Sequence, residues 1–145
     1  MDQASSARVP WHFWPVAVLS LLWNAYGGYD YTMTKLRDPG YLKMFPPKMM
    51  DWIDKMPVWA TAMWAIGVWA SLLGSTLLLM RSRHAAITFL VSLIAAAISF
   101  AYQHTISLPP SLDTGNNWIM TVVILSAIVV FWWYSRRMQA SGVLC

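Results

Sequence analysis

The sequence is poor in cysteine and in charge. Its only cysteine, Cys145, excludes an internal disulfide, a Cys-pair redox centre and a site with several thiolate ligands. Charged residues make up 11% of the 145 residues, whereas soluble proteins have about 25%. The net charge of +4 is spread over the loops and forms no basic face or stripe of the kind that nucleic-acid binding requires. Nucleic acid is therefore not an expected partner.

Catalytic and metal-binding patterns are missing as well. The sequence has no nucleophile–base pair, no paired carboxylates, no His-x-x-x-His pair and no glycine-rich phosphate loop. Its three histidines are scattered, and the predicted membrane threading puts His104 on the opposite side from His12 and His84. We therefore expect no catalytic residue, no metal and no cofactor, and we do not predict an enzyme.

What the sequence does contain is apolar residues, at 58% of the chain, and ten tryptophans. Four apolar runs occupy residues 11–31, 57–80, 85–103 and 117–134. An α-helix needs roughly 20 residues to cross about 30 Å of hydrocarbon, and tryptophan is enriched at both membrane interfaces. We therefore predict one all-α membrane domain over residues 1–145, folded as a four-helix bundle in the lipid bilayer. Bulky tryptophans and the lack of an Ala-x-Ala site favour a retained first span over a cleaved signal peptide.

The loop of residues 32–56, between the first two runs, has a helical pattern in its second half. Pro46-Pro47 stands where a helix can begin, and Pro57 stands where the next helix starts. The apolar residues between them follow the i, i+3, i+4, i+7 spacing of one helical face: Met49, Trp52, Ile53 and Met56. We predict a short amphipathic helix at about residues 47–56, either lying on the membrane surface or packed as a cap over the bundle.

Basic residues near the span ends predict the orientation, because cytoplasmic loops are enriched in Lys and Arg. One side of the membrane has arginines in short segments at the span ends: Arg8, Arg81, Arg83, Arg136 and Arg137. The loop of residues 32–56 lies on the other side and conflicts with this pattern, since it also has five basic residues. We give more weight to the short, dense segments. Both termini are then cytoplasmic, and the amphipathic helix belongs to the first extracytoplasmic loop.

Small residues mark places where helices can approach closely. In the second run they recur every four positions with a glycine beside them, and in the first run they form a pair: Gly67, Ser71, Gly74, Ser75, Gly27 and Gly28. In lipid no hydrophobic force draws helices together, so close backbone packing at small residues contributes much of their association. The stripe in the second run predicts packing within the chain or, alternatively, the face of a homo-oligomer.

A group of polar and aromatic residues provides a candidate ligand site. The first and third runs cross in the same direction, which puts Asp30 and His104 at nearly equal depth, about 13–16 Å from the midplane. Other amide, phenol and indole groups lie near that level: Asn24, Tyr26, Tyr31, Trp59, Tyr102, Gln103 and Asn117. Such groups around a cavity suit a small polar ligand. Alternatively, Asp30 and His104 only mark where helices leave the lipid, and Asn24 forms an interhelical hydrogen bond.

Two stretches have a distinctive pattern. The first comprises Pro10-Trp11-His12, Leu22-Trp23-Asn24 and Gly28-Tyr29-Asp30-Tyr31-Thr32-Met33-Thr34. The second comprises Pro57-Val58-Trp59-Ala60, Trp64-Ala65-Ile66-Gly67-Val68-Trp69, Leu72-Leu73-Gly74-Ser75 and Leu77-Leu78-Leu79-Met80-Arg81. Together they resemble a family of small proteobacterial membrane proteins with four predicted spans, whose members are often labelled "sugar transporter". The resemblance implies the bacterial inner membrane and a small polar solute.

Two functions follow from these expectations. The first is a solute-binding or transport module for a small polar molecule such as a sugar. Transporters commonly contain repeated halves, and this sequence shows no repeat between its first two and last two spans, so such a module would need to oligomerise. The alternative is a non-catalytic accessory subunit of a larger membrane complex, with the small-residue stripe of the second span as its natural contact face.

Overall fold

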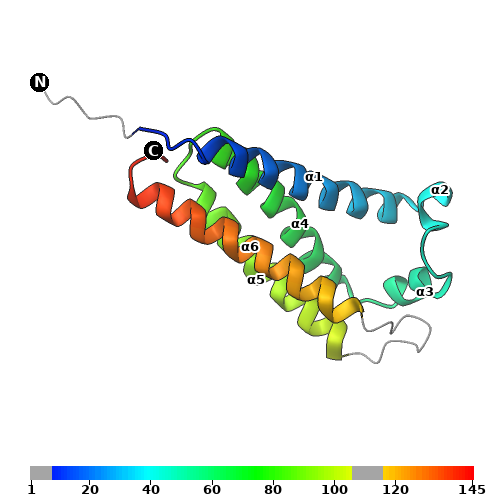
Figure 1. Ribbon diagram of the computed structural model, residues 1–145. Helices are drawn as coiled ribbons and strands as arrows, with labels where there is room; N and C mark the ends of the chain where they lie inside the picture. Colours follow the sequence, from blue (N-terminus) through cyan, green and yellow to red (C-terminus); the bar gives the residue numbers. More distant parts are fainter. Residues whose placement is uncertain (1–7, 106–115) are drawn as a thin grey trace, which may run out of the picture.

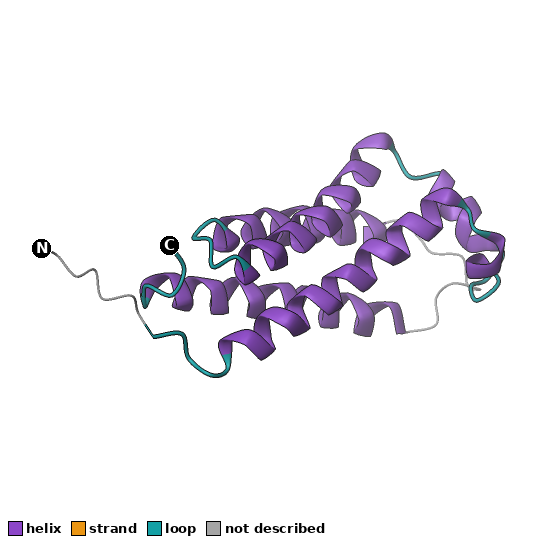
Figure 2. Cartoon of the chain, turned by 90° about the horizontal axis from the view of Figure 1, so that it is seen from above, coloured by secondary structure: helices purple, strands orange, loops and turns teal. Residues whose placement is uncertain are grey.

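The computed structural model describes residues 8–105 and 116–145, and every regular element in this part of the chain is helical (Figure 1). The elements are α1 (Phe13–Leu36), α2 (Pro39–Leu42), α3 (Lys48–Asp54), α4 (Val58–Leu79), α5 (Ala85–Thr105) and α6 (Asn116–Ala140). Figure 2 shows the four long helices lying side by side, with the short ones in the connection between α1 and α4. The predicted all-α bundle is confirmed.

The long helices pack in the order α1, α4, α5, α6. The extensive contacts are those of α4 with α5, of α5 with α6 and of α1 with α4. At the end where α1 begins and the C-terminal segment lies, which we call the terminus end of the bundle, the start of α1 also reaches α6: His12 Nδ1 lies 2.7 Å from the Tyr134 hydroxyl. Towards the opposite end, α1 diverges from α5 and α6 (Figure 1). The helix order around the bundle therefore makes α4, and not α5, the main neighbour of α1.

Three helices are long and apolar enough to cross a membrane, as judged within the described residues: Val58–Leu79, Ala85–Thr105 and Trp118–Ala140. The protein is therefore a membrane-spanning one. The 24 residues of α1 give it the length of a span, but its tryptophans and tyrosines, together with Asn24 and Asp30, lower its mean hydropathy. A membrane crossing by α1 thus stays a prediction.

The helices extend beyond the predicted apolar runs. The sequence predicts that the first apolar span ends at residue 31, but helix α1 continues to Leu36, and Arg37 ends it in the left-handed conformation (φ 55°). The fourth run was expected to end at residue 134, but α6 continues to Ala140. Hydropathy marks only the part of a helix that suits lipid, whereas the backbone hydrogen-bond ladder continues until a cap interrupts it.

The connection between α1 and α4 contains the amphipathic helix that the sequence predicts, as α3. Within it Ile53 is buried, while Lys48, Asp51 and Asp54 are exposed. The apolar face therefore turns towards the protein, which favours the cap over the surface-lying alternative. A second short helix, α2, stands where a simple turn at Asp38-Pro39-Gly40 would suffice. The Asp38 carboxylate caps it by accepting a 2.7 Å hydrogen bond from the Tyr41 backbone N–H.

The hydrophobic core lies at the terminus end of the bundle. Residues of four helices and of the C-terminal segment meet there: Phe13, Ala17, Leu78, Ala85, Phe89, Val143 and Leu144 are buried, and Phe131, Trp132 and Tyr134 pack against them. The C-terminal segment is held by backbone hydrogen bonds of 2.9 Å from Arg83 N–H to Cys145 C=O and from Cys145 N–H to Arg81 C=O. These bonds position the α4–α5 turn against the end of α6.

Candidate functional site

Asn24, the most deeply placed of the predicted ligand residues, joins two helices. Its side chain is buried, and its amide N–H donates a 2.6 Å hydrogen bond to the Ser75 hydroxyl on α4. The Ser71 hydroxyl donates to the amide oxygen of Asn24, and Ser75 donates to the Ser71 carbonyl at 3.1 Å. Both ends of the amide are therefore engaged within the chain, as in the interhelical alternative stated for this residue.

The small residues of α4 also serve contacts within the chain. The Ser92 hydroxyl of α5 donates a 2.6 Å hydrogen bond to the Gly67 carbonyl, and a Cβ added at Gly67 would lie 3.3 Å from the Ala96 backbone nitrogen. A Cβ at Gly74 would lie 3.1 Å from the Phe89 ring. Gly67 and Gly74 thus face α5, whereas Ser71 and Ser75 face α1. The packing alternative within the chain accounts for the whole stripe.

The two glycines of the α1 pair have different surroundings. A Cβ at Gly28 would make ordinary contacts with Leu72 at 3.6 Å and with Trp69 at 3.7 Å. A Cβ at Gly27 would meet nothing within 4 Å. The packing role predicted for Gly28 is therefore present against α4, whereas no such contact of Gly27 is found among the residues that the structure describes.

Asp30 lies in a group of phenols. The Tyr41 hydroxyl of α2 donates to the Asp30 carboxylate, and the Tyr29 ring meets the Tyr41 ring edge-on at 5.6 Å. Burial raises the pKa of Tyr41 well above its ordinary value, and the hydrogen bond to Asp30 raises it further, with smaller contributions from the nearby Tyr26 and Tyr29. We call these four residues the tyrosine cluster. It keeps Tyr41 a neutral hydrogen-bond donor and ties α2 to the end of α1.

Tyr31 points elsewhere, towards α4. Its ring meets Trp64 edge-on at 4.8 Å and Trp69 at 6.1 Å. The Lys35 ammonium lies 5.6 Å from the centre of the Trp64 ring, close enough for a cation–π contact. Tyr31 is therefore part of the α1–α4 interface and lies on a different side of α1 from the tyrosine cluster.

The remaining predicted residues lie along α4, α5 and α6. Trp59 meets Tyr102 edge-on at 4.9 Å, and the Gln103 amide donates to Ser99 at 3.2 Å. His104 stacks on Trp118 with ring centres 3.8 Å apart, and its Nε2 lies 3.0 Å from the Thr121 hydroxyl. The side chain of Asn117 lies outside the described residues.

The predicted ligand residues therefore lie in several separate groups, not around one site. Within the described residues, no hydrogen bond, ion pair or ring contact joins Asp30 to His104; Asp30 is bound by Tyr41, and His104 is held by Trp118 and Thr121. The reason is helix order, because α1 packs beside α4 and diverges from α5 at this end. Sequence reasoning also missed Tyr29 and Tyr41. The pair Asp38-Pro39, a helix-capping residue followed by proline, is the signal for a short helix at this point. A helix that starts there returns the chain towards Asp30, which would have placed Tyr41 beside it.

The described residues contain no group of three or more His, Cys, Asp or Glu that could hold a metal ion. No protein-family model, curated protein or solved structure matches the chain. The resemblance to the four-span "sugar transporter" family thus stays a prediction.

Proposed function

We propose that the protein is a non-catalytic accessory subunit of a larger complex in the bacterial inner membrane. It crosses the membrane four times with both termini in the cytoplasm, and it contacts its partner through α1. The partner surface is a transmembrane helix of another membrane protein. The observation that supports this role best is the unequal character of the two sides of α1.

One side of α1 is a continuous buried stripe against the rest of the bundle, formed by Phe13, Ala17, Ser20, Asn24, Gly28 and Thr34. The other side exposes large apolar and aromatic side chains along most of the helix, and we call it the outer face of α1: Trp14, Leu19, Leu22, Trp23, Tyr26 and Tyr29. Within the described residues, α4 is the main neighbour of α1, and Tyr41 of α2 contacts the outer face only at Tyr29, so most of this face is uncovered.

Aromatic polar groups on this face suit protein better than lipid. Trp23 and Tyr26 stand near the middle of α1 and are 41% and 67% exposed. Tryptophan and tyrosine normally sit at the membrane interfaces, because an indole N–H or phenol O–H in hydrocarbon is costly without a partner. In the inner part of α6, away from its ends, the exposed residues are aliphatic: Val122, Val123, Val129 and Val130. Lipid suits α6, whereas a partner helix suits α1.

The small-residue stripe of α4 does not offer a competing contact face. Its glycines pack on α5 and its serines bond to Asn24. A partner helix could reach these residues only by displacing α1 or α5. Among the described helices, α4 also exposes a tryptophan at mid-helix, Trp69 at 45%, but the outer face of α1 exposes four polar aromatic residues along one side: Trp14, Trp23, Tyr26 and Tyr29.

The experiment compares the native size of two variants after extraction from bacterial membranes in mild detergent. Trp23→Leu/Tyr26→Leu makes the outer face more lipid-like, so we expect the protein to shift from a large complex to the size of the isolated chain. Val123→Leu/Val130→Leu on α6 is the matched control and should leave the complex intact. A double α1 variant that keeps both the wild-type helicity and the large complex would contradict the proposal.

A second candidate function is the binding of a small polar solute, and the tyrosine cluster favours it. The Asp30 carboxylate and the phenols of Tyr26 and Tyr29 lie together in the second half of α1, with Tyr26 and Tyr29 at least half exposed. Carboxylates and phenols can hydrogen-bond sugar hydroxyls. A panel of neutral mono- and disaccharides should then raise the melting temperature of the wild type but not of Asp30→Asn. No response to any sugar, or an equal response in Asp30→Asn, would remove this candidate.

A further inference from the structure

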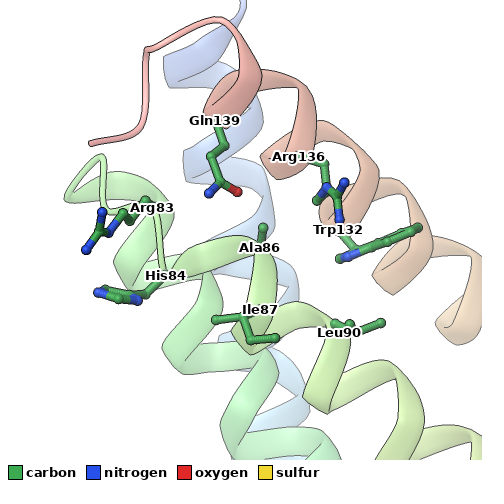
Figure 3. Close-up of a pocket in the computed structure, with 8 residues that line it drawn as sticks. All are labelled: Arg83, His84, Ala86, Ile87, Leu90, Trp132, Arg136 and Gln139. Carbon is green, nitrogen blue, oxygen red and sulfur yellow. The ribbon is translucent and has the colours of Figure 1, made fainter.

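We propose that a groove between α5 and α6, at the terminus end of the bundle, binds the phosphate headgroup of an anionic phospholipid. The groove has a volume of about 400 Å³ and is lined by Arg83, His84, Ala86, Ile87, Leu90, Trp132, Arg136 and Gln139 (Figure 3). This site lies at the opposite end of the bundle from the tyrosine cluster and does not involve the outer face of α1. The inference therefore does not depend on the accessory role.

The polar half of the groove has cationic groups on two walls. Arg83 and His84 come from the turn before α5, and Arg136 with Gln139 comes from the last turns of α6 (Figure 3). Arg136 also lies over the Trp132 ring, with its guanidinium carbon 5.9 Å from the ring centre. All four polar residues are exposed. Guanidinium groups bind phosphate oxygens strongly, and the imidazole and amide can add hydrogen bonds to phosphate or to glycerol hydroxyls.

No negative charge in the helices around this groove competes for the arginines. The sequence has no Asp or Glu between residues 55 and 105 or between residues 116 and 145. The one ion pair within the described residues joins Arg37 to Asp54 at 2.5 Å, at the far end of the bundle. The Cys145 carboxyl group lies at the Arg83 backbone N–H, but no ion pair within the described residues joins it to Arg83 or Arg136. Both guanidinium groups are therefore available to an anion from outside the chain.

The apolar half of the groove identifies the anion as a lipid. Ala86, Ile87 and Leu90 follow one another along α5, away from the arginines and into a helix that is apolar enough to span a membrane. Ile87 is 56% exposed, and the Trp132 ring forms the facing wall. A free phosphate would leave this surface uncovered, whereas an acyl chain attached to the phosphate would cover it. Basic pockets between membrane helices are known to bind anionic headgroups in this way.

The test is native mass spectrometry of the full chain in detergent, titrated with dioleoyl phosphatidylglycerol or dioleoyl phosphatidylcholine. We expect the wild type to prefer phosphatidylglycerol, and Arg83→Gln and Arg136→Gln each to weaken its binding about fivefold. Arg137→Gln is the matched control, because Arg137 lies over Trp133, 5.0 Å from the ring centre, and does not line the groove. It should bind phosphatidylglycerol as the wild type does.

Two further arms make each outcome decisive. Ile87→Glu places a carboxylate on the apolar floor and should also weaken phosphatidylglycerol binding, and helicity measured in parallel identifies any variant that has not folded. Inorganic phosphate at matched concentration should not raise the melting temperature, whereas phosphatidylglycerol should. Equal binding of the two lipids, an equal loss in Arg137→Gln, or equal stabilisation by phosphate alone would overturn the lipid site.

Discussion

Asn24 of α1 and Ser75 of α4 are joined by a 2.6 Å hydrogen bond inside the bundle, 51 residues apart in the sequence. Together with Ser71, which donates to the other end of the same amide, this contact fixes the side of α1 that faces the bundle. The opposite side is thereby exposed as the outer face of α1. The hydrogen bonds of Asn24 thus determine which side of α1 is buried and which side is free to contact a partner.

Removal of this contact should loosen α1. We expect Asn24→Ala and Ser75→Ala each to lower the free energy of unfolding in detergent by about 1 kcal/mol, the scale of interhelical hydrogen bonds in membranes. Because both variants lose the same bond, the double variant should cost less than the sum of the two. A double-mutant cycle measured by thermal unfolding checks this expectation. Fully additive losses would show that the two side chains do not interact.

The glycines of α1 and α4 should respond in opposite directions to a larger side chain. Gly67→Leu should lower stability by about 1–3 kcal/mol, because its side chain must displace the Ala96 backbone only 3.3 Å from the Cβ position. Gly27→Ala has open space and should stabilise α1 by roughly 0.5–1 kcal/mol through helix propensity. Melting temperatures of the two purified variants test the pair, and a loss in both would contradict the described packing.

The tyrosine cluster should make stability sensitive to alkaline pH. Burial and Asp30 raise the pKa of Tyr41 in the folded protein above its ordinary value of 10.0. The stabilisation is therefore fully present below about pH 10 and is lost as the pH rises towards the folded pKa. Tyr41→Phe should be less stable than the wild type at pH 8 and should lose less stability between pH 9 and 11. Parallel pH profiles of unfolding for the two proteins would refute this role.

The sequence predicted the helices better than their arrangement. Length and hydropathy located α4, α5 and α6, and proline positions predicted the start of α3, because these signals act locally. Hydropathy cannot tell which helix lies beside which, so the expected meeting of Asp30 and His104 assumed an α1–α5 contact that the bundle does not make. The sequence leaves two roles open for Asn24, an interhelical hydrogen bond and a ligand contact, because it does not show that Ser71 and Ser75 lie beside it.

The ends of the helices were hardest to predict, for a related physical reason. Tyr41 reaches Asp30 only because Arg37 ends α1 and Asp38 caps a second short helix. Val143 and Leu144 are buried only because the C-terminal segment pairs with the α4–α5 turn. Both contacts depend on chain reversals set by capping and tertiary packing, which leave no periodic pattern in the sequence.

Membrane threading can be tested by cysteine accessibility in a Cys145→Ser background. Single cysteines at Arg8 and Ser82 should resist an impermeant maleimide in intact cells whose outer membrane is permeable to it, and one at Lys43 should react. Reaction at Lys43 with protection at Arg8 also requires α1 to cross the membrane, since these positions flank it. Protection at both Arg8 and Lys43 would mean that α1 lies on one side, and reaction at Ser82 would invert the orientation.

Photo-crosslinking in living cells tests the accessory role most directly. A benzophenone side chain at Leu22, on the outer face of α1, should form a specific adduct with another membrane protein, while the same group at Val130 on α6 should form none. Both positions are more than half exposed, at 62% and 54%, so accessibility is matched. An adduct of twice the 16.5 kDa chain mass would identify a homo-oligomer instead. No protein adduct at Leu22, or equal adducts at both positions, would contradict a partner docked on α1.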